Sequence, residues 1–244
     1  MQLSFSFELS GVAVAIIAIA IICVKTGKLT IPAAALAALM AVLTALGASY
    51  GGLVLLGTFF ILGVKATSHK KQLKASADPH PQQRTAGQVF ANGGVAAIMA
   101  LLAILYPACH SICILMLAAS LASATADTLS SELGMVYGRH FYNILTFKKE
   151  PKGLDGVISL EGTLLGAAGA LLIAVVYGAF FGLNSGVLAV WIAGVVGNAI
   201  DSLLGATLER KRYIGNDAVN FLNTLLAALV GWGMLSILSV LKQI

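Results

Sequence analysis

Charged residues are scarce in this chain. Asp, Glu, Lys and Arg make up 10% of its 244 residues, hydrophobic residues make up 59%, and the mean hydropathy is +0.93. Soluble globular domains carry roughly 25% charged residues, so this composition excludes an ordinary water-soluble domain. The chain also lacks the alternating segments of about 10 residues that build a transmembrane β-barrel. The composition therefore predicts an all-α, polytopic membrane protein.

Cysteine pairs and two familiar motifs are missing as well. The three cysteines form no CxxC pair and no disulfide framework, so we interpret Cys23, Cys109 and Cys113 as packing residues. No GxxxxGK[ST] or HExxH sequence occurs, which leaves P-loop ATPases and zincins without support. The first residues, MQLSFSFELSG, show neither the basic start of a signal peptide nor the arginines of a transit peptide. We therefore expect the first helix to remain as an anchor.

Several apolar runs are close to the roughly 20 residues that cross a hydrocarbon core. They lie near residues 9–24, 32–48, 51–64, 89–106, 111–126, 160–181, 187–206 and 218–241. We expect a transmembrane bundle of about eight helices, forming a single domain over residues 1–244. Its two long cytoplasmic loops would be residues 65–88 and 139–159.

The placement of charge predicts the orientation. If the first helix enters from the outer side, the inner loops hold 14 of the 15 Lys and Arg, and only Lys242 lies outside. The positive-inside rule then puts both termini on the outer side. Every acidic residue except Glu8 also falls on or near the inner side. We expect a protein of the bacterial or archaeal inner or plasma membrane, with its chemistry at the cytoplasmic face.

The stretch ADTLSSELG directly follows an apolar run, so its acids stand at a membrane surface. On a helix, one face would carry Asp127, Ser130, Ser131, Gly134 and Gly138. Glu132 would point about 140° away from Asp127. Glycines at this spacing can simply pack transmembrane helices together, whereas an acid in a membrane helix is a candidate functional residue. The aspartate on the strip favours a functional groove, and glycine packing stays open as the alternative.

Comparable polar faces occur in other predicted helices near the same side. They are formed by Gly194, Asn198, Asp201 and Gly205, by Asn216, Asn220 and Asn223 with Asp217 beside them, and by Gln88 and Asn92. Asn216 or Asp217 can serve as a helix cap, and asparagines can join transmembrane helices. These structural roles remain alternatives for any single residue.

The loop 139–159 leads into the helix that begins SLEGTLLG. Ser159 can cap this helix, and the first turn with Gly162 offers free amides and a positive dipole end to a phosphate. Glu161 would repel a phosphate there unless a cation or donor lies between them, or it simply complements the dipole. The spacing leaves both interpretations open.

Five acids gather at the cytoplasmic ends of the predicted helices: Asp127, Glu132, Glu161, Asp201 and Asp217. Mg²⁺ is usually held by one or two carboxylates together with substrate phosphates. Nearby basic side chains stabilise a transferring phosphoryl group. The arrangement therefore favours phosphate chemistry on a lipid, with Mg²⁺ as the cofactor.

The same motifs resemble the CTP-binding signature of dolichol kinase and phytol kinase. The resemblance is carried by Asp127, Ser130, Gly134 and Gly138, then Lys148-Lys149, then SLEGT at 159–163. Ser130 stands where dolichol kinases usually have Ala, and the segment EPKGLDGVI separates the two lysines from SLEG.

The wider pattern is similar to the integral-membrane family called domain-of-unknown-function 92, which includes plant phytyl-phosphate kinase. Its features stand here as RTAGQVFANGG, SATADTLSSELG, KKEPKGLDGVISLEGTLLG, GNAIDSLLGATLER and NDAVNFLNT. The resemblance implies an isoprenoid monophosphate kinase that makes the prenyl diphosphate with CTP or a related nucleotide. A prenyl-phosphate acceptor is already anionic, so we expect no catalytic histidine.

The resemblance and the acid pattern together give the expected site. We expect Asp127, Glu132, Glu161 and Asp201 to be catalytic, with Mg²⁺ held by Asp127 and Asp201. Arg139, Lys148 and Lys149 would neutralise developing charge. The other expected nucleotide or phosphate contacts are Ser130, Ser131, Gly134, Gly138, Ser159, Gly162, Asn92, Asn198, Asn216, Asp217 and Asn220.

The expected partners are a nucleoside triphosphate, a prenyl-phosphate lipid whose tail lies between helices, and the membrane. A homo-oligomer is compatible with the sequence, and no nucleic acid is expected. One rival function is a cytidylyltransferase that attaches CMP to a lipid phosphate at a similar site. Another is a transporter of an anionic or isoprenoid solute with Asp127 and Asp201 as ion sites. Transporter sites commonly lie near the bilayer midplane, whereas these acids gather at one surface.

Overall fold

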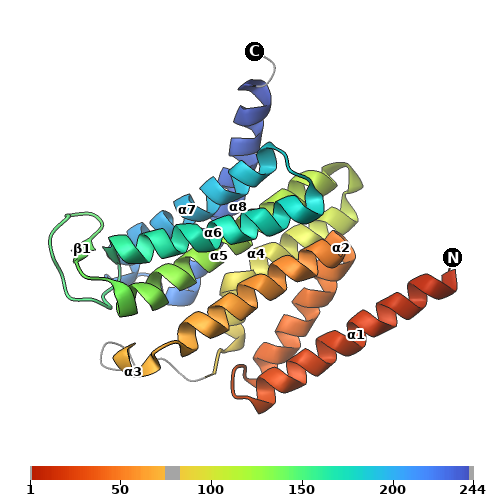
Figure 1. Cartoon of the computed structure of the whole chain (residues 1–244), viewed down its shortest axis with the longest axis horizontal. Coiled ribbons are helices and arrows are strands. Elements are labelled where there is room, and N and C mark those ends of the chain that lie inside the picture. The colour runs from red at the N-terminus through yellow and green to blue at the C-terminus, as the bar shows by residue number, and fades with distance from the viewer. Residues whose placement is uncertain (1, 75–82, 242–244) are drawn as a thin grey trace.

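α5 (His110–Tyr137) is the central helix of an all-α bundle (Figure 1). The computed structural model describes residues 2–74 and 83–241. Residues 117–126 of α5 are all buried, and apart from two leucines they are Ala, Ser or Thr. Small side chains let neighbouring helices approach closely. This run therefore makes α5 the packing axis of the bundle.

The other helices surround α5, except α1, which packs against α2 at the outside of the bundle. They are α1 (Gln2–Lys25), α2 (Ile31–Ser68), α3 (Lys71–Lys74), α4 (Ala86–Leu105), α6 (Leu160–Phe181), α7 (Ser185–Leu204) and α8 (Asn216–Leu241). Within the described ranges, 6 helices are long and apolar enough to cross a membrane, and the apolar part of α1 is shorter. The predicted all-α, polytopic membrane bundle is confirmed.

The predicted runs 32–48 and 51–64 form the two halves of α2. The helix is interrupted at Ser49, whose φ of 53° and ψ of −154° are not helical. Figure 1 shows the halves as a V, so the chain reverses direction here. Gly47 packs against the Ala100 backbone of α4, and Gly51 packs against Phe181 of α6. The glycines beside the bend thus admit neighbouring helices that larger residues would push away.

Residues 47–51 read Gly-Ala-Ser-Tyr-Gly and have the GxSxG spacing of a hydrolase nucleophile elbow. In that motif the serine stands on a turn between a strand and a helix. Ser49 instead joins two helical halves. The spacing therefore does not indicate a hydrolase.

The loop between α5 and α6 contains a small sheet that the sequence did not predict. β1 (Phe141–Asn143) pairs antiparallel with β2 (Val157–Ser159), with Phe141 opposite Ser159. Asn143 is buried, and its Oδ1 accepts hydrogen bonds from the amides of the two residues that follow Ile144. The loop is therefore folded. In the other long predicted loop, residues 75–82 lie outside the described residues.

The described outer ends of α1 and α8 lie away from the end of the bundle that holds a polar cavity. Asn216, at the start of α8, and Arg84, which pairs with Leu29 after α1, line the cavity at that end. Gln2 and Leu241 form the opposite ends of α1 and α8. The placement of both termini on the outer side stays a prediction. The assignment of the cavity to the cytoplasmic side stays a prediction from the positive-inside rule.

Candidate functional site

A cavity of about 700 Å³ opens where the ends of α4, α5, α7 and α8 meet the folded loop. Twelve of the expected site residues line it: Asn92, Asp127, Ser130, Ser131, Glu132, Gly134, Ser159, Asn198, Asp201, Asn216, Asp217 and Asn220. They come from segments more than 100 residues apart in the sequence. The fold thus brings most of the expected residues to one place.

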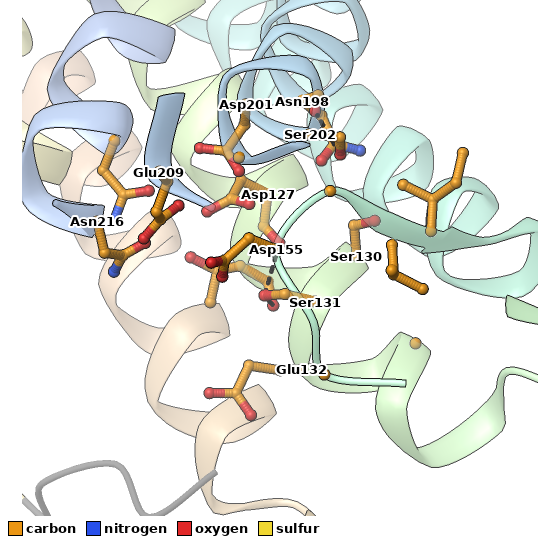
Figure 2. Close-up of a pocket in the computed structure, with 18 of the residues that line it drawn as sticks. Asp127, Ser130, Ser131, Glu132, Asp155, Asn198, Asp201, Ser202, Glu209 and Asn216 are labelled. Carbon is orange, nitrogen blue, oxygen red and sulfur yellow. Dashed lines mark hydrogen bonds between the residues drawn. The ribbon is translucent and has the colours of Figure 1, made fainter. Parts of the chain in front are cut away.

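Asp127 on α5 and Asp201 on α7 form the centre of the cavity. Both are partly buried, and their side chains lie next to each other (Figure 2). Two carboxylates this close repel one another unless a proton or a cation lies between them. The pair is therefore suited to bind a cation.

A buried polar chain fixes Asp201. Asn223 on α8 donates a hydrogen bond from Nδ2 to Oδ1 of Asp201 at 2.6 Å. Oδ1 of Asn223 accepts a hydrogen bond from Oγ of Ser123 on α5 at 2.9 Å. Ser123 and Asn223 have no exposed surface, so the three helices hold this carboxylate through matched donors and acceptors. The sequence placed Asn223 on a polar face but not among the site residues.

The cavity is also lined by two acids that were not among the expected site residues. Asp155 belongs to the folded loop, and Glu209 ends the π-helix Gly205–Glu209 that continues α7. Figure 2 shows Glu209 beside the Asp127–Asp201 pair, with Asp155 in front of it. Both stand inside the family-like stretches GLDG and ATLER. Their placement within those stretches was a signal available in the sequence.

The four acids have no basic ion-pair partner among the described residues. No three His, Cys, Asp or Glu side chains in the described ranges form a metal site on their own. Mg²⁺ typically takes one or two carboxylates and completes its shell with waters and substrate phosphates. The donor set of Asp127 and Asp201, with Asp155 and Glu209 nearby, fits such a partly open site.

Glu132 lies apart from this acid cluster (Figure 2). Its carboxylate forms an ion pair with Lys74 of α3, and both side chains are largely buried. Nζ of Lys74 also donates hydrogen bonds to the carbonyl oxygens of Ala66 and Thr67 at 2.9 Å. A cation here offsets the negative end of the α2 dipole. Glu132 thus helps to hold the end of α2 against α5.

The expected glycine strip serves helix packing. A side chain at Gly134 or Gly162 would meet the other helix, because each lies against the other's backbone. Gly138 lies against Phe141 and Ser159 in the same way. These glycines thus allow close packing, and Gly134 also lines the cavity together with Asp127, Ser130 and Ser131.

Local hydrogen bonds link polar residues of α7 and α4 at the cavity wall. Asn198 is buried at the cavity wall and its backbone oxygen accepts a hydrogen bond from Ser202. Nδ2 of Asn92 donates to the backbone oxygen of Gln88 at 3.0 Å. Gln88 itself completes a capping box with Thr85 at the start of α4. The start of α4 is thereby fixed at the cavity wall.

Six expected residues do not line the cavity: Gly138, Arg139, Lys148, Lys149, Glu161 and Gly162. Lys148 and Lys149 are exposed on the loop between β1 and β2. Oε2 of Glu161 accepts a hydrogen bond from the Arg139 amide at 3.3 Å. Ser159 caps α6 as expected, with its Oγ accepting from the Gly162 amide. Their roles in the site stay predictions.

An ion pair fixes the loop that carries Asp155. Arg210 donates hydrogen bonds to Oε2 of Glu150 at 2.8 Å and to the backbone oxygen of Asp155 at 2.7 Å. Asn143 donates to Oε1 of Glu150 at 3.1 Å. The hydrogen bond from Arg210 is the main cause that holds the pKa of Glu150 below its ordinary value. The loop is thereby tied to the segment after α7.

Arg84 is the one basic residue among the described residues that line the cavity. Its backbone amide donates to the Lys28 oxygen at 3.0 Å, and its own oxygen accepts from the Thr30 amide at 3.1 Å. Burial lowers the pKa of its guanidinium, and the nearby Glu132 carboxylate opposes this effect. An arginine remains charged at neutral pH despite such a shift. The cavity therefore combines a cluster of acids with one partly buried cation.

Comparisons with known proteins agree with this architecture. A family model described as integral membrane protein DUF92 matches residues 14–228. An uncharacterized membrane protein of Methanocaldococcus jannaschii is 37% identical over 73% of this chain and 74% of its own length. An uncharacterized membrane protein of Synechocystis is 31% identical, over 75% of this chain and 73% of its own length.

The chloroplastic protein VTE6 of Arabidopsis thaliana is also 31% identical, over 75% of this chain and 58% of its own length. No solved structure matches the chain. The family model covers well over half of the chain, including every segment that lines the cavity. The chain belongs to the integral membrane protein family DUF92.

Proposed function

We propose that this protein is a kinase of isoprenoid monophosphates that uses CTP or another nucleoside triphosphate at the cytoplasmic membrane face. The observation that carries the proposal is the Asp127–Asp201 pair in a cavity of about 700 Å³ that is also lined by a partly buried arginine, Arg84. Acids suit a magnesium-bound nucleotide, and arginine suits an anionic acceptor. The family resemblance and the similarity to VTE6 support the same role.

The proposed reaction needs little covalent help from the protein. An oxygen of the prenyl monophosphate attacks the γ-phosphorus, the bond to the β–γ bridging oxygen breaks, and the nucleoside diphosphate leaves. The acceptor oxygen is already anionic, so no side chain has to remove a proton from it. Positioning and charge stabilisation supply most of the catalysis in phosphoryl transfer. Bound Mg²⁺ would neutralise charge on the nucleotide phosphates.

The residues of this chain divide that work by position. Asp127 and Asp201 would hold Mg²⁺, and the chain through Asn223 keeps the second carboxylate oriented. The guanidinium of Arg84 would hold the acceptor phosphate on the α4 side of the cavity. The folded loop brings Asp155 to the wall of the cavity, where Arg210 donates a hydrogen bond to its backbone oxygen.

Incubation of the purified protein with Mg²⁺, labelled CTP and a panel of prenyl monophosphates tests the proposal. Label from the γ-phosphate should appear on the lipid, and label from the α-phosphate should not. The Asp127→Asn variant should lose this transfer, while Ser236→Ala, on exposed α8 surface far from the cavity, should retain it. Transfer of α-label would instead identify a cytidylyltransferase. Uptake of solute into liposomes without any lipid product would identify a transporter.

A further inference from the structure

A second cavity, of about 280 Å³, lies between α1, α2 and α4. Its walls are apolar and include Ile16, Ile19, Leu53, Leu56, Phe60 and Val89. α1 lies at the outside of the bundle along the first half of α2 (Figure 1). This apolar slot therefore lies at the lipid-facing side of the molecule.

The slot adjoins the polar cavity. Arg84, Gln88 and Asn92 line both of them. The Arg84 guanidinium is the nearest neighbour of Gly63 on α2, where the missing side chain leaves room for it. The apolar slot and the acid-lined cavity thus meet at these three residues, with the Arg84 guanidinium at their boundary. A ligand that fills both parts needs a hydrocarbon end and an anionic end.

We propose that the apolar slot holds the hydrocarbon chain of the lipid substrate, with its phosphate at the junction formed by Arg84, Gln88 and Asn92. This inference rests on the proposed kinase function, and it identifies the acceptor as a lipid with one apolar chain and a terminal phosphate. Guanidinium binds phosphate through paired hydrogen bonds, and the side-chain amides at the junction are further donors. The acceptor phosphate would then face the Asp127–Asp201 pair across the same cavity.

Gly57 of α2 provides a direct test, because it lines the slot and a side chain added there meets no atom within 4 Å. Gly57→Leu should fill the slot without disturbing its walls, and leucine favours a helix more than glycine does. Gly233→Leu on α8 is the matched control, since Gly233 also has open space around it and lines neither cavity.

Gly57→Leu should lower kcat/KM for geranylgeranyl monophosphate by about 10-fold or more. Turnover of dimethylallyl monophosphate should stay as in the Gly233→Leu control. Equal loss for both acceptors would overturn the proposal.

A binding experiment separates this inference from the kinase function. Geranylgeranyl monophosphate with a diazirine at the end of its chain is crosslinked to the full chain without nucleotide, and the labelled peptides are mapped. Label should lie on the slot-lining parts of α1, α2 and α4 and should decrease in Gly57→Leu. Such label without phosphoryl transfer would uphold the slot and reject the kinase. The slot would be overturned by phosphoryl transfer with label elsewhere, or by no label at all. It would also be overturned if phosphatidylglycerol reduced the crosslinking as effectively as unlabelled geranylgeranyl monophosphate.

Discussion

Asn223 on α8 donates a hydrogen bond to Asp201 on α7, with 2.6 Å between Nδ2 and Oδ1. The same amide accepts a hydrogen bond from Ser123 on α5. Because Asn223 is fully buried, this contact sets the orientation of Asp201 through the packing of three helices. The candidate site is therefore linked directly to the core of the bundle.

Replacing Asn223 should reduce activity by freeing Asp201. Asn223→Ala removes the donor to Asp201 and leaves the Ser123 hydroxyl without its acceptor. Loss of a residue that orients a metal-binding carboxylate usually lowers activity or metal affinity about 10- to 100-fold. Kinetics at several Mg²⁺ concentrations should show a raised Mg²⁺ requirement. Ser123→Ala keeps the donor to Asp201 and should show a much smaller change, and equal effects of both variants would contradict a positioning role.

The acid pair should contribute more to catalysis than the acid at the start of α6. Asp127→Asn and Asp201→Asn should each lower kcat by about 10²-fold or more, as expected for loss of a group that stabilises transition-state charge. Glu161 does not line the cavity, so Glu161→Gln should lose far less. The measurement is initial rate with γ-labelled CTP at saturating lipid. A larger loss for Glu161→Gln would move the nucleotide site to the start of α6.

Removal of divalent cations should abolish activity and loosen the cavity. With EDTA, the cavity holds four carboxylates close to one another: Asp127, Asp201, Asp155 and Glu209. None of them forms an ion pair with a basic residue in the described part of the chain. Readdition of Mg²⁺ should raise the melting temperature, and this rise should be smaller in Asp127→Asn. If Mg²⁺ and nucleotide added together left the melting temperature unchanged, this would count against a metal at this pair.

Arg84 should affect acceptor binding more than turnover. Arg84→Gln keeps a polar side chain at the junction of the two cavities but removes its charge. The KM for the prenyl monophosphate should rise about 10-fold or more, since charged hydrogen bonds to a phosphate contribute about 1.5–3 kcal/mol. The KM for CTP should change little. The opposite pattern would place the nucleotide, and not the lipid phosphate, at Arg84.

The ion pair between Arg210 and Glu150 should keep the loop ordered at neutral pH. The pKa of Glu150 is held below its ordinary value, so the pair stabilises the folded loop above the ordinary glutamate pKa of about 4.3 and loses this effect as pH falls below it. Hydrogen exchange of the Ile144 amide, which bonds to the Gly156 oxygen, reports the order of the loop. Glu150→Gln should reduce the protection of this amide at pH 7. The wild-type chain should lose the same protection only below pH about 4.3, where Glu150 becomes protonated. Exchange rates equal to wild type at pH 7 would show that the loop is held by other contacts.

The sequence determined the membrane class, the helices and the acidic character of the candidate site. Apolar runs of sufficient length must become helices in a bilayer, because every backbone amide and carbonyl needs an internal partner there. Acids at the ends of such runs stand out because charge is rare in a membrane. Asp127 and Asp201 could therefore be selected from the sequence, although they lie 74 positions apart.

Only the tertiary structure decided which polar residues share a cavity. Glu161 and Lys148 belong to the same family-like stretches as Asp155, yet only Asp155 reaches the cavity, because the loop pairing and Arg210 direct it there. Glu132 forms an ion pair with Lys74. The two residues belong to distant segments, so helical spacing in the sequence does not reveal this contact. The junction at Arg84 likewise depends on how α1 and α2 pack against α4. Helical spacing is a local property, whereas the meeting of helix ends is set by packing along the whole chain.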